Sequence, residues 1–125
     1  MWITLLRAKL HRATVTDANI QYTGSISIDT NLLETSGMMA YEKVLVVDVE
    51  NGQRFETYII PAKAGSGAIQ VNGAAARLVS IGDHVIIMAF AGVELPAPSD
   101  WKPRVVLLDA ANHPTGLAAE DPGED

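Results

Sequence analysis

Hydrophobic and polar residues alternate over short stretches of this chain, and the alternation predicts β-strands. Near the start, Ala8 and Leu10 fall on one side of an extended segment. Lys9 and His11 therefore share the opposite side, because side chains two residues apart on a strand point the same way. Further apolar or β-branched runs predict strands over residues 44–49, 54–60, 69–71, 85–90 and 105–108.

Turn and capping signals separate these predicted strands. Asn51-Gly52 is typical of a tight hairpin, and Pro61 should end the strand that returns from it. Asp29-Thr30 can cap a short helix that Gly37 ends, and residues 74–78 predict a further helical turn or two. Seven or so strands with two short helices indicate an all-β fold with short helices, closed into a β-barrel whose type the periodicity does not identify.

The length of 125 residues suits a single domain with one core, and 48% of the residues are hydrophobic, which is enough to fold most of the chain. We expect the barrel to occupy residues 1–110. The last six residues contain four acids and no base. Residues 111–125 are therefore predicted to form an acidic, disordered tail.

Charge and composition exclude several classes of function. The net charge is −6, but without the four C-terminal acids 11 acids face nine bases, so the body is nearly neutral. Nucleic-acid binding needs a basic face and is not expected. The chain has no cysteine, which excludes disulfides, thiolate catalysis and cysteine-bound zinc. No apolar run reaches the roughly 18 residues that span a membrane, and no signal-peptide pattern is evident. We expect a cytoplasmic protein.

The first candidate for chemistry is Tyr22-Thr23-Gly24-Ser25. Taken alone, a Gly-Ser pair is most simply a turn. It also has what self-cleavage needs, because the Ser25 hydroxyl follows the Gly24 carbonyl and glycine bends most easily toward attack. An N→O acyl shift, elimination of the Gly24 carboxylate and hydrolysis of the resulting dehydroalanine would convert Ser25 into a pyruvoyl group and release ammonia.

Two further stretches carry polar groups that suit a small anionic substrate. In the first, Arg54 and Tyr58 are four residues apart and share a strand face, while Thr57 points away. An arginine can clamp a carboxylate with two hydrogen bonds, and a tyrosine can donate a proton. In the second, Asn72 precedes small residues at a helix start, where backbone N–H groups are open to an anion. Alone, these stretches are also typical of an ordinary hairpin and of a turn that leads into a helix.

Together and in this order, the motifs closely resemble the aspartate 1-decarboxylase family over roughly residues 1–110. The matching stretches are Lys9-Leu10-His11-Arg12, Tyr22-Thr23-Gly24-Ser25, Asn51-Gly52-Gln53-Arg54-Phe55-Glu56-Thr57-Tyr58, Val71-Asn72-Gly73-Ala74-Ala75-Ala76 and Gly82-Asp83-His84-Val85-Ile86-Ile87. The resemblance implies a double-psi β-barrel and a homotetramer with active sites between subunits.

The resemblance also implies a reaction. The proenzyme would cut itself between Gly24 and Ser25, and the pyruvoyl group made from Ser25 would replace pyridoxal phosphate, with no metal. L-Aspartate would join this group as a Schiff base, lose its α-carboxylate as CO2 and leave as β-alanine for pantothenate biosynthesis. The carbonyl serves as the electron sink.

Individual roles follow from the same resemblance. Tyr58 matches the proton donor, and Arg54 and Lys9 match the ligands of the substrate carboxylates. Thr57 matches a residue of self-cleavage and substrate contact, although alternation turns it away from Arg54 and Tyr58; a twist, a bulge or use across a subunit boundary would resolve this. The remaining matches are the loop around the reacting group and polar residues that line the site: Asn72, Gly73, Ala74 and Ala75 in the loop, and His11 and Tyr22 in the lining.

Two alternatives remain at this stage. A self-processing hydrolase would keep Ser25 as an amine-bearing N-terminal nucleophile, without loss of ammonia. A non-catalytic barrel would serve as a binding or scaffold module and would not cleave at all. A β-barrel alone does not distinguish these functions, so the decarboxylase interpretation depends on the set of motifs.

Overall fold

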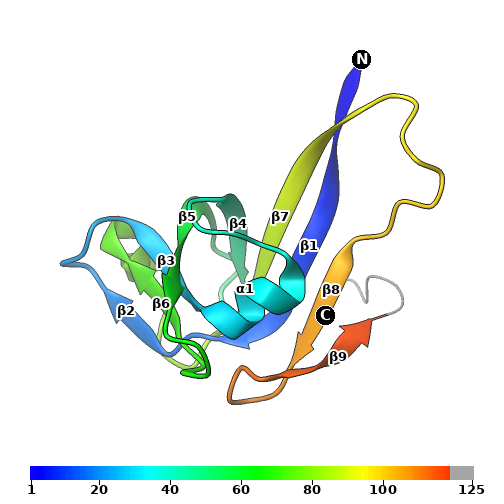
Figure 1. Ribbon diagram of the computed structural model, residues 1–125. Coiled ribbons are helices and arrows are strands. Elements are labelled where there is room, and N and C mark those ends of the chain that lie inside the picture. Colours follow the sequence, from blue (N-terminus) through cyan, green and yellow to red (C-terminus); the bar gives the residue numbers. More distant parts are fainter. Residues whose placement is uncertain (119–125) are drawn as a thin grey trace.

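The computed structural model describes residues 1–118, and these form a β-rich single domain with two short helices (Figure 1). The elements in chain order are β1 (Trp2–Thr14), β2 (Asp17–Asn19), β3 (Ser25–Asp29), α1 (Thr30–Ser36), β4 (Lys43–Asp48), β5 (Arg54–Ala62), β6 (Ile69–Asn72), the 3-10 helix η1 (Gly73–Leu78), β7 (His84–Glu94), β8 (Arg104–Leu108) and β9 (Pro114–Ala118). The expected all-β fold with short helices is confirmed.

The strands follow the order β2-β6-β3-β5-β4-β7-β1-β8-β9. Most neighbours are antiparallel, but β1 with β8, β2 with β6 and β3 with β5 are parallel. The chain leaves β1 in one half of the sheet and enters β2 in the other, where the Thr16 N–H donates to the Ile69 carbonyl at 2.9 Å. This contact brings the end of β1 beside β6, although the two strands are far apart in the sheet order.

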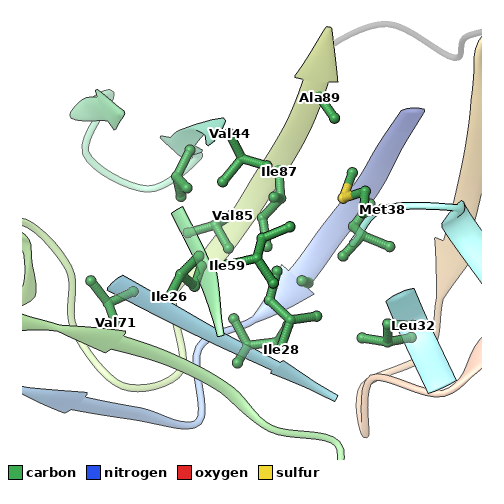
Figure 2. Packing of buried hydrophobic residues seen from close by; sticks show 14 of the residues in the cluster. Ile26, Ile28, Leu32, Met38, Val44, Ile59, Val71, Val85, Ile87 and Ala89 are labelled. Atoms are coloured by element: carbon green, nitrogen blue, oxygen red, sulfur yellow. The ribbon is translucent and has the colours of Figure 1, made fainter. Parts of the chain in front are cut away.

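Branched aliphatic side chains fill the interior of the barrel (Figure 2). Ile26 and Ile28 are two residues apart on β3 and are fully buried, as are Ile59 on β5 and Ile87 on β7. Each such side chain contributes about 1.5–3 kcal/mol when it leaves water. Since β3 lies between β5 and β6, this packing holds the strand that begins with Ser25 in place.

Helix α1 begins after Asp29 and ends at Gly37, the two capping residues predicted from the sequence. The Asp29 carboxylate accepts the Asn31 N–H at 2.8 Å, and Gly37 adopts the left-handed conformation at the other end. Asp29 also accepts N–H groups of Gly65 and Gly67. Burial raises its pKa, but the Gly67, Asn31 and Gly65 donors outweigh burial, so the pKa lies below its usual value.

The prediction that Pro61 ends its strand is wrong. Strand β5 runs through Pro61 to Ala62. Its pairing with β4 covers Arg54 to Tyr58, and beyond that point β5 pairs with β3, where Ile28 is opposite Pro61. Past the end of the β4 pairing, β5 can accommodate a residue that has no N–H to donate.

The prediction of a disordered tail is wrong for residues 111–118. Strand β9 pairs with β8, and the preceding turn buries Asn112. The Asn112 side chain accepts the Thr14 N–H at 2.7 Å and donates to the Thr14 and Gly67 carbonyls, both at 2.8 Å. These polar contacts have no hydrophobic signature in the sequence. The most acidic part of the predicted tail, residues 119–125, lies outside the described residues.

Two carboxyl groups lie beside each other: that of Asp48, at the end of β4, and that of Asp83, just before the start of β7. Asp48 is fully buried, and its Oδ1 accepts the Glu50 N–H at 2.9 Å. Burial, with a hydrogen bond to Asp83, raises the pKa of Asp48 to about 6. The same hydrogen bond, with the Ser80 N–H, lowers the pKa of Asp83. Below about pH 6, protonated Asp48 therefore donates a hydrogen bond to the ionised Asp83, and above that pH the two neighbouring carboxylates repel each other.

We predict that Asp48→Asn stabilises the protein at pH 7.5 by roughly 1–2 kcal/mol, since an amide can make both hydrogen bonds without a buried charge. The pKa of Asp48 is raised in the folded state, so its stabilisation is present below about pH 4 and is lost as the pH rises through about 6. Urea unfolding between pH 4 and 8 measures both effects. The exposed Asp100→Asn is the control, and an Asp48→Asn variant less stable than wild type at pH 7.5 would contradict the prediction.

Candidate active site

Ser25 and Asn72 face each other across two buried strands. They are paired in the antiparallel register of β3 and β6, and both are almost fully buried. The Asn72 Nδ2 donates to the Ser25 Oγ at 2.9 Å and to the Ser27 Oγ at 3.1 Å. The Gln70 Nε2 donates to the Asn72 Oδ1 at 2.7 Å. This arrangement directs the amino end of the amide toward the Ser25 hydroxyl.

Asn72 occupies the N-cap position of η1, but its side chain makes no capping hydrogen bond there. Asparagine at this position usually accepts an N–H of the first helical turn. Here the side chain turns to Ser25, so its hydrogen bonds support the site rather than the helix. Ala74 and Ala75 follow in the first turn of η1.

Gly73 brings the start of η1 against the residue that precedes Ser25. It has φ +75°, and a Cβ at this position would lie 2.6 Å from the Gly24 Cα and 2.8 Å from the Gly24 nitrogen. It would also lie 3.3 Å from the carbonyl oxygen of Tyr22. Only glycine therefore permits this approach of two backbones. Gly24 is exposed while Ser25 is buried, so the peptide bond between them lies at the boundary of solvent and interior.

Tyr58 and Thr57 lie on β5 beside the same strand. The parallel register of Ile26 with Ile59 places Tyr58 level with Ser25, one residue earlier on each strand. Strand alternation turns Thr57 to the opposite face, as the sequence predicted, yet Thr57 and Tyr58 both line a cavity of about 280 Å³ together with Lys43 and Glu56. Thr57 and Tyr58 therefore both border this cavity, although alternation gives them opposite faces of the strand.

Arg54 lies at the exposed start of β5, opposite Val47 of β4. It shares a strand face with Tyr58 by alternation, as predicted. Tyr22 is 60% exposed, and its backbone carbonyl lies near Gly73.

Three strands separate the strand of Lys9 and His11 from the strand of Ser25 in the sheet order. Both residues lie on β1, and β5, β4 and β7 come between β1 and β3. Figure 1 shows β3 and β6 on one side of the molecule and β8, the neighbour of β1, on the other. Both side chains are buried, and His11 lines a second cavity of about 240 Å³ with Arg12, Thr14, His84 and Asp109 among others.

Three residues near the site were missed from the sequence. Gln70 and Ser27 contact Asn72, and each is two residues from a predicted site residue on the same strand, so shared strand faces could have indicated them. Tyr41 stacks on Tyr58, with ring centroids 6.4 Å apart and an interplanar angle of 23°. Tyr41 lies in a loop, where no strand or helix pattern in the sequence indicated that it would contact Tyr58.

Over residues 1–118, no group of three or more histidine, aspartate or glutamate side chains is arranged to hold a metal ion. In the same part of the chain, no helix is both long and apolar enough to cross a membrane.

The chain is similar in sequence to known proteins over most of its length. Residues 1–115 match the family described as Aspartate decarboxylase. The chain is 55% identical over 114 residues to the aspartate 1-decarboxylase of Chloroherpeton thalassium, covering 91% of this chain and 84% of that protein. It is 54% identical over 112 residues to that of Carboxydothermus hydrogenoformans, covering 90% and 88%, and 49% identical over 122 residues to that of Bacillus licheniformis, covering 98% and 96%. A solved structure, the rationally designed protein mkDPBB_sym_86, has a TM-score of 0.47 and 22% identity, covering 66% of this chain and 91% of that one.

We predict that Gly73→Ala destabilises the protein more than Gly52→Ala does. The two glycines have nearly equal φ, +75° and +74°, but an added Cβ meets Gly24 at the first and nothing within 4 Å at the second. Gly52→Ala should cost about 1 kcal/mol for the backbone conformation alone. Gly73→Ala should cost about 2 kcal/mol or more, since the two backbones must separate. Urea unfolding measures the difference, and equal losses would show that the contact with Gly24 is not what requires a glycine.

Proposed function

Since the chain belongs to the aspartate decarboxylase family, we propose that it is made as a proenzyme that cuts itself between Gly24 and Ser25 and then converts L-aspartate to β-alanine and CO2. The observation that carries the proposal is the hydrogen bond of 2.9 Å between the Asn72 Nδ2 and the Ser25 Oγ, beside the close contact of Gly73 with Gly24. In the cytoplasm, the β-alanine would be available for pantothenate synthesis.

The proposed cleavage uses the groups that surround Ser25. The Oγ attacks the Gly24 carbonyl carbon, the C–N bond breaks, and the Ser25 nitrogen takes up a proton, which leaves an ester. Loss of the Ser25 α-proton breaks the Cβ–O bond and releases the Gly24 carboxylate. The dehydroalanine then takes up water and loses ammonia. The Asn72 N–H donor supports this route because it fixes the position of the attacking oxygen.

The surroundings of Ser25 fit the small ketone that would result. A pyruvoyl group differs from an N-terminal serine by the loss of one ammonia: its Cβ is a methyl group, and its ketone oxygen is on the former Cα. The Asn72 Nδ2 that contacts the Oγ is a nearby donor from which this oxygen could accept. When formed, the group supplies a carbonyl that reacts with the substrate amine and withdraws electrons from the bond that breaks. Tyr58, level with Ser25 on β5, is suited to deliver a proton to the former α-carbon of the substrate.

The two carboxylates of aspartate call for cationic partners. Arg54 can hold one through two hydrogen bonds, and Lys9 is the second basic residue expected from the resemblance. Because three strands separate β1 from β3 in the sheet order, we propose that a second copy of the chain supplies Lys9, in a homotetramer with sites between subunits. The exposed apolar side chains of the projecting β1–β7 arm, Met1, Trp2, Ile3 and Phe90, support such an assembly.

We predict that the purified protein yields two fragments, residues 1–24 and 25–125, with the larger one lighter by one ammonia than a fragment with N-terminal serine. Intact-mass spectrometry measures this, and a hydrazide probe should label the larger fragment because it carries a ketone. Ser25→Ala should remain a single chain without labelling or β-alanine production.

The exposed Ser80→Ala is the matched control and should cleave normally. A larger fragment that keeps its amine would favour the self-processing hydrolase, and a folded wild-type protein that stays intact and forms no β-alanine would contradict the proposal.

We predict that Lys9→Ala and Tyr58→Phe complement each other when co-expressed with different tags. Each variant alone should be nearly inactive. In assemblies that contain both, about a quarter of sites combine an unchanged Lys9 with an unchanged Tyr58, so about a quarter of the wild-type rate should return. β-Alanine formation by doubly tagged assemblies measures this. Activity no higher than that of the separate variants, or a monomer in light scattering, would contradict a shared site.

A further inference from the structure

Tyr41 holds a backbone conformation that tyrosine rarely adopts. Its φ is +67°, in the left-handed region that glycine and asparagine occupy most readily. Asn112 is also left-handed, with φ +64°, but its side chain makes three hydrogen bonds that explain this conformation. When a bulky residue adopts left-handed φ and ψ values, the surrounding structure must enforce this strained conformation. Such residues are often found at functional sites.

Burial does not explain why position 41 carries a large side chain. Tyr41 is 76% exposed, so its ring adds little to the core. The Tyr41 N–H donates to the Ile59 carbonyl of β5 at 2.8 Å, and the carbonyl of the next residue, Glu42, accepts the Ile59 N–H at 3.1 Å. Glycine or asparagine would satisfy the same backbone with less strain.

The ring itself has one contact with a site residue. It stacks on Tyr58 with centroids 6.4 Å apart and planes inclined by 23°. Stacking of this kind limits the rotation of both rings, and the Tyr41 ring is anchored by a backbone fixed against the residue that follows Tyr58. Tyr58 is only half-buried and therefore needs such a support to keep one orientation.

We propose that Tyr41 is a positioning residue that holds the phenol of Tyr58 toward the carbon beside position 25. This inference rests on the proposed decarboxylation and deepens it. Tyr41 touches no reacting atom; it acts by keeping the Tyr58 hydroxyl within reach of the substrate carbon that takes up the proton, and a small misplacement of such a group lowers the rate strongly.

The test compares Tyr41→Asn with Tyr41→Phe in the self-cleaved protein. Tyr41→Asn relieves the backbone and removes the ring, so thermal unfolding should shift to higher temperature while kcat falls roughly tenfold and KM changes less than about twofold. Tyr41→Phe keeps the ring and the strain and should match wild type in both properties. Met39→Asn changes a neighbouring exposed side chain and is the control for this loop.

Opposite shifts of stability and kcat are the expected result, since a merely structural ring would lower both together. Unchanged kcat in Tyr41→Asn would overturn the inference. A lower kcat accompanied by a smaller assembly in light scattering would overturn it as well, because the ring would then serve contact between copies.

A second readout does not need catalysis and separates this inference from the proposed reaction. In protein with isotope-labelled tyrosine, the NMR signals of the Tyr58 ring, assigned with Tyr58→Phe, should carry the ring-current shift of the stacked partner. The shift should persist in Tyr41→Phe and vanish in Tyr41→Asn. If wild type forms no β-alanine, the proposed function fails. Even then, loss of the ring-current shift in Tyr41→Asn would show that Tyr41 holds the ring of Tyr58. A shift that is unchanged in Tyr41→Asn overturns the inference in either case.

Discussion

The antiparallel pairing of β3 with β6 is the constraint on which the rest of the site depends. It sets Ser25 opposite Asn72, although 47 residues separate them in the chain. A shift of register by one residue would turn every side chain of β3 to the other face. Ile26 and Ile28 would then leave the core, so hydrophobic packing protects the register that brings the hydroxyl to the amide.

The polar groups in this pairing are buried and must satisfy one another. Asn72 donates to Ser25 and Ser27 and accepts from Gln70, which leaves neither end of the amide without a partner. A buried amide that lacks a hydrogen bond costs about 1–3 kcal/mol. The network therefore stabilises one arrangement of the Ser25 hydroxyl. Gly73 completes it, since its lack of a side chain lets η1 begin against Gly24.

The barrel also explains why the candidate site is divided. Its residues on β3, β5 and β6 converge, whereas β1 carries Lys9 in another part of the sheet.

The sequence by itself determined the features that depend on neighbouring residues. Asp29 and Gly37 bound α1, Asn51-Gly52 follows β4 as predicted, and the β-branched runs form strands, because capping, turn geometry and face alternation act over a few positions. The order and spacing of the motifs were also enough to indicate the family.

Only the tertiary structure decided which of these segments meet. The sequence did not reveal that Gln70 would orient Asn72, that Tyr41 would stack on Tyr58, or that Asn112 would anchor residues predicted to be disordered. It also did not reveal that three strands would separate that of Lys9 from that of Ser25 in the sheet order. Strand order and register arise from closing one core around the whole chain, and local patterns carry no information about which distant strand becomes a neighbour.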